Sequence, residues 1–375
     1  MKKIILSFAT VILMASCCQK ELNVVVENKA DFARSSETVE VNWSDVQSKL
    51  NLSKGDSVIV LNAEGKQIPY QILTEGTDTP QKLIFQADVA AAGKAEYKVE
   101  KGSPEHFPAK AFARFVPERY DDFAWENDLV AFRVYGPALK AIDGPNNGID
   151  AWTKRTNNLI IDEWYHRQEV EGKNYHSDYG TGCDYYAVGR TLGAGAAAPY
   201  VNDTIWLGEN FETYKVLDNG PVRASFQLTY GAYDVNGKSI SEVKTISIDA
   251  GSQMSKMSVD YSNDSILDVA AGLVKRADGD SVFFAADKSF VAYQDRENLK
   301  NGTTFLALVS PTQFKDTKVN CNHVLGTMSI KPEQNAEYYF GFGWSKWGFD
   351  SFEQWIQYVT AFDARLKNPL EVTVK

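Results

Sequence analysis

The sequence predicts an all-β protein, made of a small N-terminal β-sandwich and a large, many-stranded antiparallel sandwich, with one packing helix near the C-terminus. Apolar residues recur at every second position in short runs, which is the period of a half-buried strand. Gly, Asn, Asp and Lys turns separate these runs, and no βαβ spacing interrupts them. With 20 Phe, 18 Tyr and 8 Trp among 375 residues, the chain can fill a large core.

The first expected domain covers residues 22–102 and consists of short alternating strands. The expected strands centre on Leu22–Val26, Val39–Val41, Val58–Val60, Ile68–Ile72, Leu83–Phe85 and Tyr97–Val99. Such strands, broken by polar turns, predict an antiparallel sandwich. The stretch 101–108 contains two prolines and predicts a linker to the second domain.

The second expected domain, residues 109–375, repeats this rhythm of strands and turns over a longer span. Its clearest turn signal is the pair Asn236–Gly237, because these residue types favour the positive φ angles of a two-residue hairpin. The flanking apolar residues are Phe226, Leu228 and Tyr230 before the pair, and Val243, Ile246 and Ile248 after it. Two long paired strands are therefore expected here.

One helix is expected near the C-terminus, closing an end of the large sandwich. The apolar residues at helical spacing are Phe352, Trp355, Val359, Phe362 and Leu366. Asp350 and Glu353 predict a capping box, and Asn368–Pro369 predicts the helix end. The alternation of residues 370–374 then predicts a final strand of the second domain.

The N-terminus has the pattern of a lipoprotein signal peptide, expected to span residues 1–16. Two lysines precede an apolar run that is too short to cross a bilayer as a lasting helix. Ala15 and Ser16 then lead to Cys17, the expected lipidation site, and residues 17–21 form a tether. The alternative is an ordinary cleaved signal with an incidental cysteine. We expect a membrane-anchored lipoprotein that contacts the membrane through its lipid alone.

The charge of the chain argues against nucleic acid as a partner. The formal net charge is −10, and removal of residues 1–16 makes it about −12, because two lysines are lost. An acidic surface repels phosphate backbones. The remaining cysteines, Cys183 and Cys321, are far apart in sequence, so we expect them to lie singly as small buried residues, with a disulfide as the alternative.

Polar, titratable and aromatic residues are concentrated in three segments, residues 116–137, 148–155 and 162–190. Such groups are poor core material, because each buried polar group needs a partner. They suit a sugar cleft, in which aromatic faces stack on pyranose rings, carboxylates accept from hydroxyls and cations neutralise a uronate. The alternative is that Trp and Tyr fill the sandwich while the charged residues form solvated loops.

The candidate residues come from these segments. The catalytic candidates are His176, Tyr175, Tyr179, His166 and Arg190. The substrate-binding candidates are Glu126, Arg133, Lys154, Asp178, Trp125, Trp152 and Trp164. We expect no cofactor and no metal, since His166 and His176 lie ten positions apart without a zinc-binding spacing. Calcium on Asp178 and Asp184 is a minor alternative, and the Gly–Ala run 193–198 predicts close backbone packing rather than a phosphate loop.

The order of these motifs carries a family resemblance. PERYDDFAWENDLVAFRVYGPAL, GIDAWTKR, WYH, YHSDYGTGCDYYAVGRTLGAG and DNGPVRASF occur in succession. This succession resembles the domain of unknown function 4861, a family of secreted proteins in glycan-degrading Gram-negative bacteria, and covers most of residues 109–375. The resemblance implies a galactose-mutarotase-like supersandwich and an association with polysaccharide utilisation. It implies no established activity, and it places the anchor on the periplasmic side or the outer-membrane surface.

The first functional hypothesis is elimination, by a lyase or dehydratase, on oligosaccharides that contain uronic acid. His176 would act as base or acid, with Tyr175 or Tyr179 as its complement. Arg190, Arg133 or Lys154 would neutralise the uronate carboxylate. The alternatives are a glycoside hydrolase that uses Glu126 and Asp178 as its carboxylate pair, and a non-catalytic glycan-binding lipoprotein. Two histidines in the cluster favour chemistry, because histidine titrates near neutrality.

Overall fold

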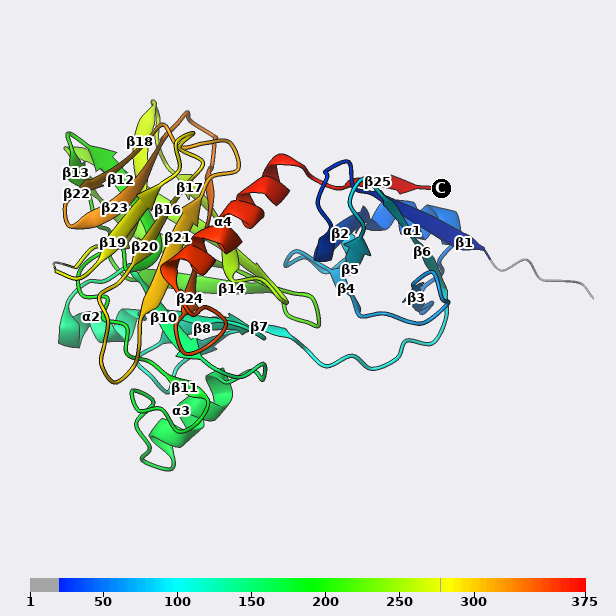
Figure 1. Cartoon of the computed structure of the whole chain (residues 1–375), viewed down its shortest axis with the longest axis horizontal. Helices are drawn as coiled ribbons and strands as arrows, with labels where there is room; N and C mark the ends of the chain where they lie inside the picture. Colours follow the sequence, from blue (N-terminus) through cyan, green and yellow to red (C-terminus); the bar gives the residue numbers. More distant parts are fainter. Residues whose placement is uncertain (1–19, 277) are drawn as a thin grey trace, which may run out of the picture.

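The computed structural model describes residues 20–276 and 278–375. The expected signal peptide, residues 1–16, and Cys17 lie outside the described residues. Figure 1 shows a smaller N-terminal unit beside a larger one, and strands dominate both units. The all-β prediction is therefore confirmed. Across the described ranges, no helix is both long and apolar enough to cross a membrane.

The N-terminal unit consists of two antiparallel sheets, with strand orders β25-β1-β6-β3 and β2-β5-β4. Its elements are β1 (Glu21–Glu27), β2 (Arg34–Asn42), α1 (Trp43–Leu50), β3 (Val58–Leu61), β4 (Tyr70–Leu73), β5 (Lys82–Val89), β6 (Lys94–Lys101) and β25 (Glu371–Val374). Leu22, Val24 and Val26 alternate as predicted and are fully buried in the small core between the sheets.

The last strand, β25, corrects the expected boundary 109–375, because it belongs to the N-terminal unit. It pairs antiparallel with β1, so that Val374 lies opposite Val24. Alternation predicted a strand, but its partner depends on where the preceding helix ends. The Arg34 guanidinium of β2 donates to the Asn368 carbonyl oxygen at 2.6 Å and holds that helix end against the N-terminal unit.

The larger unit contains three antiparallel sheets. The first, in spatial order, consists of β14 (Phe211–Asp218), β15 (Arg223–Val235), β16 (Lys238–Asp249), β17 (Met254–Tyr261), β24 (Ala336–Trp344), β21 (Thr304–Val309), β20 (Phe290–Gln294) and β19 (Ser281–Phe284). The second consists of β13 (Thr204–Ile205), β12 (Ala194–Val201), β18 (Leu267–Val274), β23 (His323–Ile330) and β22 (Asp316–Asn320). The third consists of β11 (Gly182–Cys183), β10 (Ile149–Lys154), β9 (Ala131–Val134), β8 (Asp122–Asn127) and β7 (Ala111–Val116).

The two five-stranded sheets adjoin and together cover the inner face of the eight-stranded sheet. A backbone bridge between Ile149 and Gly193 connects them. Gly193 has φ +61°, and a Cβ atom there would clash with the Ile149 carbonyl oxygen, so only glycine allows this approach. The predicted close packing of this Gly–Ala run is thus observed. One continuous core, with buried residues from all three sheets, fills the sandwich.

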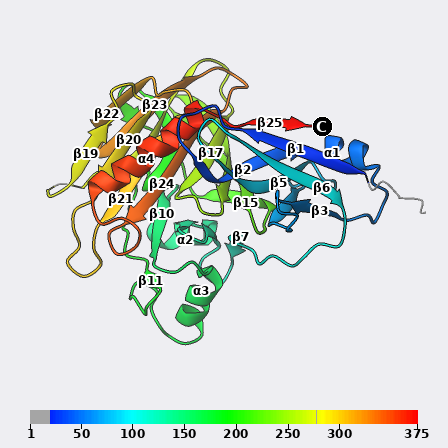
Figure 2. The same ribbon diagram turned by 45° about the vertical axis from the view of Figure 1, so that its right-hand side comes forward.

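Hairpin and helix predictions can be compared directly with the structure. Asn236 and Gly237 have φ values of 53° and 84° and connect β15 to β16 as predicted. Helix α4 (Phe352–Lys367) lies along the outer face of β20, β21 and β24, with Trp355 and Val359 buried against that face (Figure 2). Its N-cap is Ser351, whose side chain accepts from the Gln354 amide, so the predicted cap at Asp350 is wrong by one residue.

Three helices were not predicted: α1, α2 (Pro137–Asp143) and α3 (Ile161–Glu169). They contain only 8, 7 and 9 residues, which is too short for a helical period to stand out against the strand pattern. Both described cysteines are free; Cys183 is buried as expected, whereas Cys321 is exposed, which corrects the expectation for that residue.

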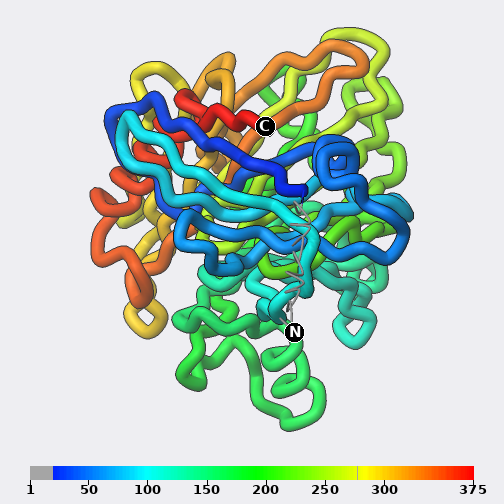
Figure 3. The backbone as a smooth tube through the Cα atoms, turned by 90° about the vertical axis from the view of Figure 1, so that its right-hand side faces the viewer, coloured from blue at the N-terminus to red at the C-terminus, as the bar shows by residue number. Residues whose placement is uncertain are grey.

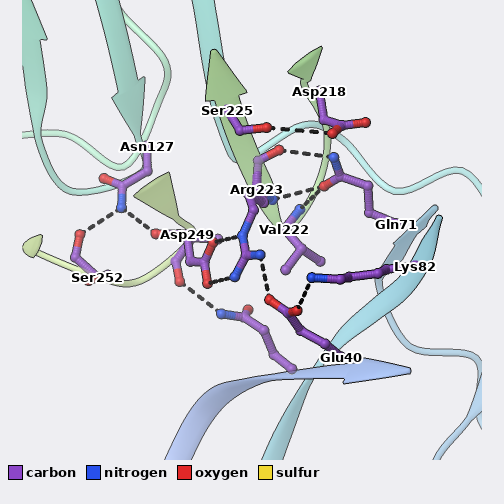
Figure 4. A network of polar contacts seen from close by, with 12 residues as sticks. Glu40, Gln71, Lys82, Asn127, Asp218, Val222, Arg223, Ser225, Asp249 and Ser252 are labelled. Carbon is purple, nitrogen blue, oxygen red and sulfur yellow. Dashed lines mark hydrogen bonds and ion pairs between the residues drawn. The ribbon is translucent and has the colours of Figure 1, made fainter. Parts of the chain in front are cut away.

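The N-terminal unit covers one side of the larger unit (Figure 3). Gln71 crosses the boundary between them, because its side chain accepts from the Arg223 amide at 2.8 Å and donates to the Arg223 carbonyl oxygen at 2.9 Å. The Asp218 carboxylate accepts from the backbone amides of Thr74 and Glu75 at 2.7 and 3.0 Å. These bonds fix the two units against each other (Figure 4).

Candidate functional site

A buried charge cluster lies where β8, β9, β10 and the segment after β11 meet. At its centre is Arg133 of β9, which is almost fully buried. Its Nε and Nη2 atoms donate to Asp150 Oδ2 at 3.1 and 2.6 Å, and Nη2 also donates to Asp184 Oδ2 at 3.0 Å. Asp122 of β8 is a third carboxyl group, 3.7 Å from Arg133 Nη1. Three segments distant in sequence thus meet around one guanidinium group.

The cluster has more carboxyl groups than its central cation can neutralise. Burial raises the pKa of Asp122 to about 6, although the Arg133 guanidinium opposes this shift. Burial and the charge of Asp150 raise the pKa of Asp184 well above its usual range. The cluster therefore retains a proton at pH values at which an exposed aspartic acid has lost it. Asp122 Oδ2 and Asp150 Oδ1 have no hydrogen-bond partner among the described residues.

His176 lies at the exposed edge of this cluster. Its side chain is 52% exposed, and Nδ1 lies 2.8 Å from the Asp184 carbonyl oxygen and 3.4 Å from Asp184 Oδ2. A carbonyl oxygen only accepts hydrogen bonds, so this contact assigns the proton of the neutral imidazole to Nδ1. The free lone pair is then on Nε2, which makes no hydrogen bond to any described residue. This is the tautomer required of a general base that acts through Nε2.

Tyr175 connects the exposed histidine with the buried cations. Its phenol oxygen accepts from Arg119 Nε and from Arg133 Nη1, each at 3.0 Å. Its ring contacts the His176 ring, with the centroids 4.6 Å apart, and packs against Trp152 on the other side. The side chain is nearly fully buried. Tyr175 therefore positions His176 and shares its hydrogen bonds with the cluster.

Three other candidates lie on loops or the helix surface. Tyr179 is half-exposed, and no described side chain ties it to the cluster. His166 on α3 is 61% exposed, and its only described polar contact is Glu171 at 3.9 Å. Asp178 accepts from the backbone amides of Gly180 and Gly182 at 2.8 and 3.1 Å, and pairs with Arg155 at 3.0 Å. Asp178 thus shapes the loop between α3 and β11.

Arg190 is placed away from the cluster. Its guanidinium donates to the backbone carbonyl oxygens of Pro145, Leu207 and Gly208. All of its described partners are neutral carbonyl groups, so this arginine joins two loops. The structure therefore corrects its assignment as a catalytic or carboxylate-neutralising residue.

Glu126 and Lys154 form a separate, fully buried ion pair with 3.0 Å between Oε2 and Nζ. The Glu126 carboxylate also accepts from the amides of Ile160 and Ile161, at 2.8 Å each. The whole hydrogen-bonding capacity of this pair is used inside the protein. The structure therefore places both residues in a structural role, which corrects the expectation that they bind substrate.

The three tryptophans expected to stack on sugar rings are also buried. Trp125 belongs to the main core, and its indole donates to Ser255 at 3.2 Å. Trp152 and Trp164 stack on each other beneath the charge cluster, with ring centroids 5.3 Å apart. None of these rings presents a face to solvent, so the core interpretation holds for all three. Trp347, 38% exposed, is the accessible tryptophan among the described residues.

Four members of the cluster were not among the candidates: Arg119, Asp122, Asp150 and Asp184. All lie inside the quoted motifs, and Asp184 was considered only as a calcium ligand. Alternation along β8, β9 and β10 would have placed Asp122, Arg133 and Asp150 on strands. Their pairing depends on neighbouring strands, because Asp150 lies directly opposite Arg133 in the register of β9 and β10.

Comparison with known proteins is decisive for the family. The family model described as Domain of unknown function (DUF4861) matches residues 26–372. The chain belongs to this family. A relative from Formosa agariphila, described as "Uncharacterized protein P7", is 30% identical over 397 residues and is matched over the whole of both chains.

Solved structures with the same fold are much less similar in sequence. A protein in the glycosyl hydrolase family 38 from Enterococcus faecalis has a TM-score of 0.52 and 11% identity, over 95% of this chain and 47% of that one. An α-mannosidase from Enterococcus faecalis V583 gives a TM-score of 0.49 at 10% identity, over 95% and 46% of the two chains. The chain thus spans about half the length of these structures. The DUF4861 match itself includes the N-terminal unit, so both units belong to the family domain.

Proposed function

We propose that the protein is a carbohydrate-active lipoprotein that acts by elimination, as a lyase or dehydratase, on oligosaccharides containing uronic acid. The observation that supports this most strongly is the half-exposed His176, with Nδ1 held 2.8 Å from the Asp184 carbonyl oxygen and Nε2 free. The glycan substrate is also in keeping with the shared fold of a protein in glycosyl hydrolase family 38.

In the proposed reaction His176 Nε2 removes the proton from C5 of the uronate. The electron pair of the C5–H bond forms a C4=C5 double bond, and the C4–O bond breaks. The leaving oxygen takes a proton, for which the newly formed imidazolium is the nearest acid. The Asp184 carboxyl group, 3.4 Å from Nδ1, lies in position to interact with this imidazolium.

The uronate carboxylate requires a cation, because its charge opposes removal of the C5 proton. Arg133 and Lys154 are buried in ion pairs, and Arg190 is bound to backbone carbonyl groups. Arg119 is only partly buried, donates to Tyr175 through Nε, and its Nη1 has no hydrogen-bond partner among the described residues. We therefore assign carboxylate neutralisation to Arg119.

Elimination has a direct optical test. Incubation of the protein with uronate oligosaccharides is expected to produce ultraviolet absorbance, since the new double bond is conjugated with the carboxylate. Product masses distinguish a lyase, which cleaves the chain, from a dehydratase, which removes water. Binding without unsaturated or hydrolysed product, across a broad panel of uronates, would instead identify a glycan-binding lipoprotein.

Hydrolysis is less well supported. It requires two carboxyl groups that reach the glycosidic bond. Glu126 is fully buried and paired with Lys154. Asp178 is bound to two backbone amides and to Arg155. Neither is presented as a free acid.

The proposed anchor predicts that Cys17→Ala moves the protein out of the membrane pellet when cells are fractionated, because lipid attachment at this residue is the only proposed contact with the membrane. Cys18→Ala is the matched control and should remain in the pellet. Retention of the Cys17 variant at the level of the parent would exclude lipidation at this residue.

A further inference from the structure

A large groove separates the N-terminal unit from the outer face of the eight-stranded sheet. It has a volume of about 700 Å³, within the range of ligand pockets, and it lies at a boundary between units, where such pockets are common. Strands β2, β15, β16 and β17 and helix α4 contribute to its walls. None of its lining residues belongs to the cluster around Arg133. The groove is therefore a separate place in the molecule.

The floor of the groove is rich in hydroxyl and amide groups. Its members on β15, β16 and β17 are Ser225, Gln227, Thr245, Ser247 and Ser258. They alternate along the strands with residues of the main core, such as Phe226 and Ile246, and so face outward. Hydroxyl and amide groups both donate and accept hydrogen bonds, as sugar hydroxyls require.

Aromatic rings form another wall. Tyr358 and Phe362 of α4 and Tyr339 of β24 line the groove. The Tyr339 and Phe362 rings meet edge to face, with centroids 5.2 Å apart. A polar floor beside aromatic surfaces is the combination that a pyranose ring recognises, since one side of the sugar carries hydroxyls and its faces are apolar.

The charges of the groove favour an anionic ligand. Arg223 is already neutralised by Asp249 and Glu40, each at 2.6 Å, and Lys82 pairs with Glu40 at 2.8 Å (Figure 4). Arg365 of α4 also lines the groove, and its guanidinium has no ion-pair partner among the described residues. It is therefore the cation available to a carboxylate or sulfate on the ligand.

We propose that this groove binds an acidic oligosaccharide and forms a second glycan site, separate from His176. The inference does not depend on elimination at the first site. The walls are held in place by the contacts of Arg223, Gln71 and Asp218 across the boundary, so the site is formed before the ligand arrives.

The groove can be blocked without removing any of its supports. Ser247→Trp places a large ring on the floor, whereas Ser239→Trp makes the same change at an exposed position of the same strand, outside the groove. Calorimetric titration would use an oligogalacturonide and a neutral cello-oligosaccharide of equal length, on the full chain carrying His176→Ala to prevent turnover. One binding event for the oligogalacturonide should be lost in Ser247→Trp and kept in Ser239→Trp.

Arg365→Gln tests the charge and guards against misfolding of the tryptophan variant. Its affinity for the oligogalacturonide should fall about tenfold, as expected for one charge-assisted contact, with binding of the neutral probe unchanged. Lys331→Gln, an exposed cation outside the groove, is the control. Unchanged affinity in both groove variants, or no binding of either probe to the parent, would overturn the second site. Loss of the binding event without any unsaturated product from the parent would uphold the groove and refute elimination.

Discussion

His176→Ala is expected to lower the rate of product formation from uronate oligosaccharides by about a hundredfold or more, the usual contribution of a general acid or base. The imidazole is half-exposed, and it contacts Asp184 only through Nδ1. Its removal therefore takes away the proton acceptor without disturbing a buried contact network. Binding of the substrate should persist, because proton transfer acts mainly in the transition state. Initial rates of absorbance and calorimetric titration measure the two quantities separately.

His166→Ala is the matched control, since it removes the same side chain from an exposed position on α3, where the described polar contact is Glu171 at 3.9 Å. This variant should retain the rate of the parent. A similar loss in both variants, or full activity of His176→Ala, would contradict the assignment of His176 as the base.

Local patterns predicted much of the fold. Period-two alternation located β1 from Leu22, Val24 and Val26, because one face of that strand is buried. Helical spacing located α4 for the same reason. Alternation contains no information about the partner strand, so β25 was assigned to the larger unit although it pairs with β1. The pairing is decided by chain segments about 340 positions apart.

The candidate site was predicted as a region but only partly as residues. The density of polar groups correctly identified the segments that hold Arg133, Tyr175 and His176. It did not distinguish an exposed aromatic from a buried one, because Trp152 and Trp164 stack on each other in the core. Burial depends on the packing of neighbouring strands and helices, which composition does not specify.

The second site lay outside what sequence patterns can indicate. Its lining ranges from Ser35 to Leu366 and comes from both units. The small polar residues of β15 to β17 appeared simply as the solvent-facing half of an alternating strand. Only the position of the N-terminal unit, fixed by Gln71 and Asp218, turns that face into a wall of a groove.

Lys154→Met is expected to lower the free energy of unfolding by about 3–5 kcal/mol, as is typical when one partner of a buried ion pair is removed. Lys154 Nζ donates to Glu126 Oε2 at 3.0 Å and to the carbonyl oxygens of Asn127 and Asn158 at 2.8 and 2.6 Å. Methionine fills a similar volume but donates no hydrogen bond. The variant leaves the Glu126 carboxylate buried beside two backbone amides without its cation. Urea denaturation of the variant and the parent gives the difference.

Two further variants test whether this loss comes from the unpaired charge. Lys140→Met removes a lysine whose pair with Glu209 is about half-exposed on both sides, and it should change stability by about 1 kcal/mol or less. The double variant Glu126→Gln with Lys154→Met removes both charges, and it should be more stable than Lys154→Met alone, because no unpaired buried charge remains. Equal losses in Lys154→Met and Lys140→Met would mean that the buried pair carries no more stability than a surface pair. The structural role assigned to Glu126 and Lys154 would then be wrong.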